Sequence, residues 1–157
     1  METSQLIAAL KDQFLLEGDE NLARRIAEKM SVESVDEDAI LMEEDDPGSD
    51  LFFILSGGVD VIVGGTRLNQ IKEHYHVGDM AIVDPKGKRS ATILATVPST
   101  VGKVSGADFE AIANEFPILW KNLAVELANR LRQTNRWLTE FETGTEPPAI
   151  DDEAVNG

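Results

Sequence analysis

The residues best suited to chemistry lie in one stretch, VGDMAIVDPKGKRSAT, which runs from Val77 to Thr92. This stretch concentrates positive charge in a chain whose net charge is −15. Its basic side chains are Lys86, Lys88 and Arg89. The two histidines of the chain, His74 and His76, come just before it. Three interpretations are open: a metal site, a phosphate site, or a charged loop between strands.

The metal interpretation uses His74, His76 and Asp79. Side chains two positions apart point to the same side of a strand, so both imidazoles could reach one ion. Small β-rolls of the cupin type add a further histidine to such a His-x-His pair, and this chain has no third histidine. We therefore expect no metal site, and keep a metal-dependent, cupin-like enzyme as the less favoured alternative.

The phosphate interpretation uses Arg89 and the segment Gly78-Asp79-Met80-Ala81. That segment predicts a single helical turn, whose first backbone N–H groups are free to bind phosphate. Arg89 begins the next strand and offers a planar fork that can bond two phosphate oxygens. Asp79 beside an anion makes sense if it accepts a hydrogen bond from a hydroxyl of the same ligand. These groups together suit a ligand that carries both a phosphate and a sugar hydroxyl.

The composition narrows the class of protein. A chain of 157 residues with 42% apolar residues is long enough for one domain with a core. It has no cysteine, which excludes disulfides and thiol chemistry. We expect a cytoplasmic protein, because the N-terminal METSQLIAALKDQ is unlike a secretory signal and no apolar run reaches the roughly 18 residues of a membrane span. The acidic charge argues against a nucleic-acid partner, which needs a basic face. It does not oppose a small anion, since charges beyond about 8 Å are largely screened.

Short β-rich runs occupy residues 32–104. The strands that they predict must hold the stretch from Val77 to Thr92 in place. The runs are AILM, LFFIL, VDVIV, TRLNQI, ATILATV and TVGKV, separated by turn signals such as DDPGSD and DPKGK. Gly64 and Gly65 predict a two-residue hairpin turn with positive φ angles. Strands at this spacing, with no helices between them, indicate an antiparallel sandwich or roll.

Helices are predicted on both sides of the strands. Residues 3–12 and 22–30 form the N-terminal pair, and residues 107–116 follow the last strand. Pro117 suits the first turn of a longer helix that reaches about Glu140. The remaining segment, residues 143–157, is acidic and has too little apolar surface to fold, so we expect a disordered tail.

The long helix carries an apolar stripe whose members step alternately by four and three residues. They are Trp120, Ala124, Leu127, Leu131, Thr134, Leu138 and Phe141. We call this set the seam. Such spacing is typical of a coiled coil. The seam could pack on the protein's own strands, but we favour a homodimer through the helix at 117–141.

The stretch from Val77 to Thr92 resembles the phosphate-binding cassette of cyclic nucleotide-binding domains. EEDDPGSDLFFILSGGVDVIV and SGADFEAIANEFPILWKNLAVELANRLRQTN are similar to other parts of that family, so the match runs from about Leu22 to Leu138. The resemblance implies a mainly β fold, an antiparallel jelly-roll β-barrel with flanking helices and a long C-terminal helix. The domain would span residues 1–142, with the roll at about 32–104 and the C-terminal helices at about 107–140.

The resemblance also assigns roles. Arg89 would pair with the cyclic phosphate, and Asp79, at the family's glutamate position, would accept from the ribose 2′-hydroxyl. Ser90 would bond the phosphate or the base. The resemblance implies backbone contacts from Gly78, Met80 and Ala81, and base contacts from Thr134 and Asn135, one from each subunit of a dimer.

The function implied is a cyclic nucleotide sensor that signals through movement of the C-terminal helix. The resemblance favours cAMP over cGMP, because Ser90 stands where a threonine would suit cGMP. We expect no enzyme activity, no cofactor, and no membrane or nucleic-acid partner. Since the resemblance does not extend to a helix-turn-helix segment, we expect an unknown output protein as a partner. The alternative within the same fold is a member that binds no nucleotide and acts by protein contacts.

Overall fold

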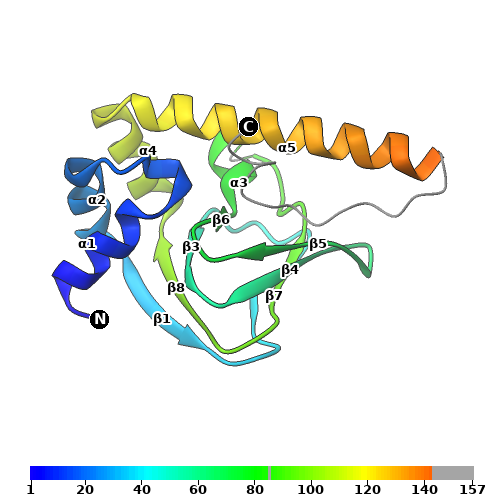
Figure 1. The fold of residues 1–157 in the computed structure, drawn as a ribbon, viewed down its shortest axis with the longest axis horizontal. Helices are drawn as coiled ribbons and strands as arrows, with labels where there is room; N and C mark the ends of the chain where they lie inside the picture. The colour runs from blue at the N-terminus through cyan, green and yellow to red at the C-terminus, as the bar shows by residue number, and fades with distance from the viewer. Residues whose placement is uncertain (85, 143–157) are drawn as a thin grey trace.

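Two antiparallel sheets form the centre of the molecule (Figure 1). The computed structural model describes residues 1–84 and 86–142, with side chains through residue 140. One sheet has the order β1 (Ser31–Val35), β8 (Ser99–Val104), β3 (Leu51–Ser56) and β6 (His76–Val77). The other has the order β2 (Ile40–Met42), β7 (Thr92–Ala95), β4 (Gly58–Val63) and β5 (Thr66–Lys72). The predicted jelly roll is confirmed, and the expected tail at 143–157 lies outside the described residues.

The hairpin between β4 and β5 forms at the predicted glycines. Gly64 and Gly65 have φ angles of 58° and 78°, which match a turn that requires positive φ at both positions. Val59 is fully buried, and Val61 and Val63 pack on the same cluster of apolar side chains between the two sheets. The alternating valines of the VDVIV run therefore lie on the face of β4 that packs against the apolar cluster, as predicted.

Strands β1 and β6 are not among the runs identified in the sequence. β1 is a sheet edge that pairs only with β8, and none of its five residues is fully buried. β6 has two residues, too few for an alternating pattern. Both strands are fixed by pairing with distant strands, so their sequences carry little local signal.

The shorter helices gather at one end of the roll (Figure 1). They are α1 (Thr3–Lys11), the 3₁₀ turn η1 (Phe14–Leu16), α2 (Glu20–Ala27) and α4 (Gly106–Glu115). Asp19 caps α2 by accepting from the backbone N–H of Leu22 at 3.0 Å, and Ser105 caps α4 by accepting from Asp108 at 3.1 Å. These helices bury a second apolar cluster, which includes Phe53 of β3.

The long helix α5 (Ile118–Glu142) begins after Pro117, as predicted, and runs over α3 (Asp79–Val83) along one side of the molecule (Figure 1). Leu119 and Leu123 anchor its first turns in the apolar cluster. Farther along, the buried side chains are polar and step by four, three and four residues. They are Asn122, Glu126, Asn129 and Gln133. Beyond Leu123, therefore, the buried side chains of the described part of the helix are polar.

Much of the seam is exposed to solvent. Leu131 and Leu138 are 62% and 59% exposed, and Ala124 and Thr134 are also exposed. Trp120 and Leu127 are partly buried against the apolar cluster, and the side chain of Phe141 lies outside the described residues. The alternative in which the whole seam packs on its own strands is thus wrong for the described part of the chain.

None of the helices in the described part of the chain combines the length and the apolar character needed to cross a bilayer.

Candidate functional site

A cavity of about 410 Å³ lies between the roll, α3 and α5. Its walls are mainly apolar, with a few polar side chains, and its volume falls in the range of small-molecule sites. Strands β4, β5 and β7 contribute the apolar wall, and α5 contributes Leu127, Arg130, Leu131, Thr134 and Trp137. The cavity is therefore closed on one side by the helix that docks through polar groups.

Seven of the eight predicted ligand-binding residues line this cavity. They are Gly78, Asp79, Met80, Ala81, Arg89, Ser90 and Thr134. Asn135 is exposed and is not part of the cavity lining. A contact from Asn135 to a ligand would need a second copy of the chain, so its role stays a prediction.

Gly78 is required at the start of α3. Its φ of 98° is strained for any residue with a Cβ. A Cβ at this position would lie 2.6 Å from the carbonyl oxygen of Asp50 and 3.1 Å from Nη1 of Arg89. Gly78 therefore allows the backbone turn and the close approach of the Arg89 guanidinium.

Arg89 is buried without a carboxylate partner in the described part of the chain. It is 5% exposed, and it donates to the carbonyl oxygens of Asp50 at 2.8 Å and of Gly78 at 3.5 Å. The Asp50 carboxylate pairs instead with Lys103 at 3.6 Å. Burial lowers the pKa of Arg89, and the charge of Asp50 offsets part of that effect. A buried guanidinium that contacts only carbonyls keeps both charge and N–H groups available for an anion.

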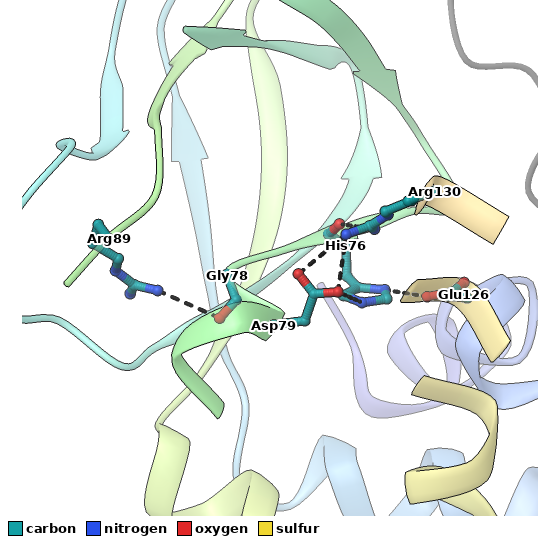
Figure 2. A network of polar contacts seen from close by, with 6 residues as sticks. All are labelled: His76, Gly78, Asp79, Arg89, Glu126 and Arg130. Carbon is teal, nitrogen blue, oxygen red and sulfur yellow. Dashed lines mark hydrogen bonds and ion pairs between the residues drawn. The ribbon is translucent and has the colours of Figure 1, made fainter. Parts of the chain in front are cut away.

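Asp79 points away from Arg89 and is held by Arg130 (Figure 2). Nη1 of Arg130 donates to its two carboxylate oxygens at 3.1 and 2.9 Å, and Nη2 donates to the carbonyl of His76 at 3.1 Å. Burial alone raises the pKa of Asp79, but the charge of Arg130 and the contact with His76 outweigh it, so the pKa lies below its ordinary value. The carboxylate is therefore ionised and already paired in the ligand-free protein.

His76 lies between two carboxylates and is 0% exposed. Its Nε2 is 3.4 Å from Asp79 of α3, and its Nδ1 is 3.1 Å from Glu126 of α5 (Figure 2). These are ion-pair distances without aligned hydrogen-bond geometry. The imidazole thus connects the ligand cavity with the long helix.

His74 takes no part in this network. It lies in the turn before β6 with a φ of 78°, and its ring packs edge-on against Phe14 at 6.0 Å. The two histidines therefore do not share one strand face, which the metal interpretation required. Among residues 1–84 and 86–140, no group of three or more histidine, aspartate or glutamate side chains is arranged to hold a metal ion.

Sequence reasoning missed two partners that α5 supplies, Glu126 and Arg130, and placed Trp137 near Thr134 without assigning it to the site. These residues recur at spacings of four and seven and so share one helix face. That spacing could have indicated a polar face of the helix directed at the site. The apolar periodicity of the seam on the neighbouring face is the stronger pattern in the sequence. The indole Nε1 of Trp137 is also buried without a hydrogen-bond partner in the described structure.

Comparison with known families gives a match over more than half of the chain. Residues 32–116 match the model of the cyclic nucleotide-binding domain. In solved structures, the regulatory domain of Toxoplasma gondii PKA with cAMP superimposes with a TM-score of 0.67 at 16% identity. That match covers 78% of this chain and 49% of the other, and at this identity it shows a shared fold.

Two curated relatives are Pycsar effector proteins. PaPycTIR of Pseudomonas aeruginosa is 43% identical over 126 residues, which make up 80% of this chain and 41% of that protein. BcPycTIR of Burkholderia cepacia is 33% identical over 132 residues, which make up 84% of this chain and 44% of that protein. The chain therefore spans less than half the length of these relatives.

Proposed function

The chain belongs to the cyclic nucleotide-binding domain family, and from this premise we propose that it is a cyclic nucleotide sensor module. The observation that carries the proposal is Arg89, a guanidinium buried in the cavity wall whose partners in the described part of the chain are carbonyls. Such a group pairs with an anion that fits the cavity, and a cyclic phosphate has the required charge and size. Gly78 lets the Arg89 guanidinium lie close to the backbone at the start of α3.

The sugar and base would extend from Arg89 toward α5. In Figure 2, Arg89 approaches Gly78 from one side, while Asp79 and Arg130 lie on the other. The predicted acceptance of a ribose hydroxyl by Asp79 would therefore occur beside its existing pair with Arg130. Thr134 and Trp137 line the same end of the cavity and are available to the base.

Signalling would proceed through α5, because this helix both closes the cavity and docks on the roll through polar side chains. Polar contacts that become hydrated on movement lose less than apolar ones do, so a second position of the helix would be accessible to a ligand-driven shift. A ligand that grips one position better shifts the population toward it, by no more than its differential affinity for the two positions.

The module would sense and not catalyse. The curated relatives are named effector proteins, and the chain matches less than half of each. We therefore place the module as the sensing part of an effector system whose output lies in another segment or partner. The rival function, protein contact without a nucleotide, is favoured by Asp79, which is one methylene shorter than the family's glutamate.

We expect cAMP to stabilise the folded protein more than cGMP, because the exposed Ser90 lines the cavity where a threonine would suit cGMP. A ligand that binds only the folded state increases the free energy of unfolding, by about 2.7 kcal/mol at a concentration of about 100 times Kd. The unfolding temperature rises accordingly. Thermal unfolding with the cyclic nucleotides of adenine, guanine, cytosine and uracil shows which of them stabilises the protein most. The matching linear 5′-monophosphates serve as controls. Equal melting temperatures with and without every cyclic nucleotide would favour the rival function.

The proposed dimer rests on the exposed seam of α5. Leu131 and Leu138 lie seven residues apart on one helix face, and both are mostly exposed. Pairing two such helices would bury these side chains and would place Thr134 between them. The partner is therefore proposed to be a second copy of the chain.

Replacing Leu131 with aspartate is expected to convert the dimer into a monomer, because a charge cannot be buried at the centre of a coiled-coil seam. Val125 is 48% exposed on another face of α5, so Val125→Asp is the matched control and should leave the dimer intact. Sedimentation equilibrium gives the mass of both variants. A wild-type monomer, or an unchanged mass for Leu131→Asp, contradicts the proposed dimer.

A further inference from the structure

His76 forms a second polar connection between the Asp79 carboxylate and α5, beside the direct ion pair of Asp79 with Arg130. Asp79, His76 and Glu126 are 3%, 0% and 5% exposed. The imidazole contacts Asp79 through Nε2 and Glu126 through Nδ1 (Figure 2). A movement of either carboxylate is therefore transmitted through a rigid ring to the other.

The charges around the imidazole are unbalanced when it is neutral. Asp79 on α3 and Glu126 on α5 are the two acids that face it, and Arg130 on α5 bonds the His76 carbonyl and the Asp79 carboxylate. From β3, Phe53 presents an aromatic ring at 6.0 Å, which brings no charge. With Arg130 paired to Asp79, His76 is the one partner of the buried Glu126 carboxylate among residues 1–84 and 86–140.

Protonation of the imidazole restores the balance. A neutral imidazole carries one N–H group and so can donate to only one of the two carboxylates. The other carboxylate then faces a ring lone pair, which is repulsive. An imidazolium carries N–H groups on both nitrogens and brings the four side chains to zero net charge. The protonated form therefore holds α5 against the roll more firmly than the neutral form does.

The docked position of α5 is also the position that completes the cavity. Leu127, Thr134 and Trp137 line the cavity only while the helix lies on the roll. A ligand that needs this wall binds with an apparent affinity reduced by the fraction of molecules in which the wall is absent. Anything that holds Glu126 to His76 therefore strengthens ligand binding.

We propose that His76 is a positioning residue that links proton uptake to ligand binding, by bridging Asp79 in the cavity to Glu126 on α5. The inference rests on the proposed function, because the ligand is the cyclic nucleotide proposed for this site. The nucleotide binds more tightly at mildly acidic pH than at mildly alkaline pH. The cyclic phosphodiester keeps one negative charge across this range, so the pH dependence originates in the protein.

The test is a calorimetric pH profile of the full chain with cAMP, or with whichever of the four cyclic nucleotides stabilises it most. Between about pH 5.5 and about pH 8.5, wild-type affinity is expected to fall about tenfold, the scale of one charged hydrogen bond. Glu126→Gln removes the unbalanced carboxylate, so its affinity stays within about threefold across the range. His76→Gln has no titrating ring and should also give a flat profile. His74→Gln is the matched control and keeps the wild-type slope.

Each outcome separates the inference from the proposed function. Absence of binding by the wild type at every pH contradicts the proposed function itself. Binding with a flat wild-type profile contradicts only the link to His76. The link is also contradicted if His76→Gln and Glu126→Gln weaken binding by one constant factor while keeping the wild-type slope, because His76 would then be merely structural. If His76→Gln does not fold, the Glu126→Gln profile alone decides.

Discussion

Replacing Arg89 with alanine is expected to weaken cyclic nucleotide binding by about 1.5–3 kcal/mol, roughly a ten- to 150-fold rise in Kd. The reason is that the buried guanidinium donates to only two carbonyls, keeps further N–H groups available for an anion, and has no carboxylate partner in the described structure. Calorimetry on the variant and the wild type measures the difference. Arg89→Lys keeps the positive charge but loses the planar fork, so its Kd should lie between those of the wild type and of Arg89→Ala.

Lys88 provides the matched control for this experiment. It is exposed, adjacent in sequence, and not part of the cavity lining. Lys88→Ala should change Kd by less than about threefold, and this effect should fade at higher salt because a surface charge acts only through a screened field. If Arg89→Ala stays folded and binds as tightly as the wild type, the phosphate does not bind at Arg89.

Replacing Asp79 with asparagine is expected to lower the free energy of unfolding by about 3 kcal/mol. Removing one partner of a buried ion pair costs about 3–5 kcal/mol, since the remaining charge stays buried. The lower end applies because the Arg130 side chain is 22% exposed and retains access to water. Urea unfolding followed by tryptophan fluorescence measures the change. An exposed carboxylate, such as Glu110→Gln on α4, is the control and should cost less than about 0.5 kcal/mol.

The same variant gives a defined dependence on pH. Since the folded-state pKa of Asp79 is lowered, its stabilising contribution is fully present above the unfolded-state pKa of about 3.9. That contribution is lost as the pH falls from there toward the folded-state pKa. The difference in stability between wild type and Asp79→Asn should therefore shrink below about pH 4. A difference at about pH 3 as large as at about pH 7 contradicts the pairing of Asp79 with Arg130.

Much of the fold was predictable because its signals are local. Gly64 and Gly65 fix a hairpin by their positive φ angles, and Pro117 marks the start of α5. The segment after Gly78 forms the predicted helical turn. Strands β1 and β6 were not predicted from the sequence. They are held extended by pairing with distant strands, so their own residues carry little local signal.

The buried face of α5 was harder to predict. Apolar periodicity identified the seam, whose members are largely exposed, while the helix docks through Asn122, Glu126, Asn129 and Gln133. Buried polar side chains are stable only where partners meet them, and sequence spacing does not reveal those partners. Asn122, for example, donates to the carbonyl of Leu15, which lies more than a hundred residues earlier in the chain.

The cavity, like the fold, combines residues that are close in sequence with residues supplied by a distant helix. The predicted cassette residues lie together at the cavity, because Gly78, Asp79 and Arg89 are close in sequence. Arg130 and Glu126 were missed because they meet Asp79 and His76 from a helix some 50 residues away. The short Asp79 side chain is reached by Arg130 from α5.

The central claim is that this cavity binds a cyclic nucleotide, and calorimetric titration of the wild-type chain tests it most directly. We predict one nucleotide bound per chain, with a Kd in the micromolar range or tighter, for at least one cyclic nucleotide. Repeating the titration at a second temperature ensures that a binding enthalpy near zero is not mistaken for absence of binding. Absence of heat at both temperatures with the cyclic nucleotides of all four bases would contradict the claim.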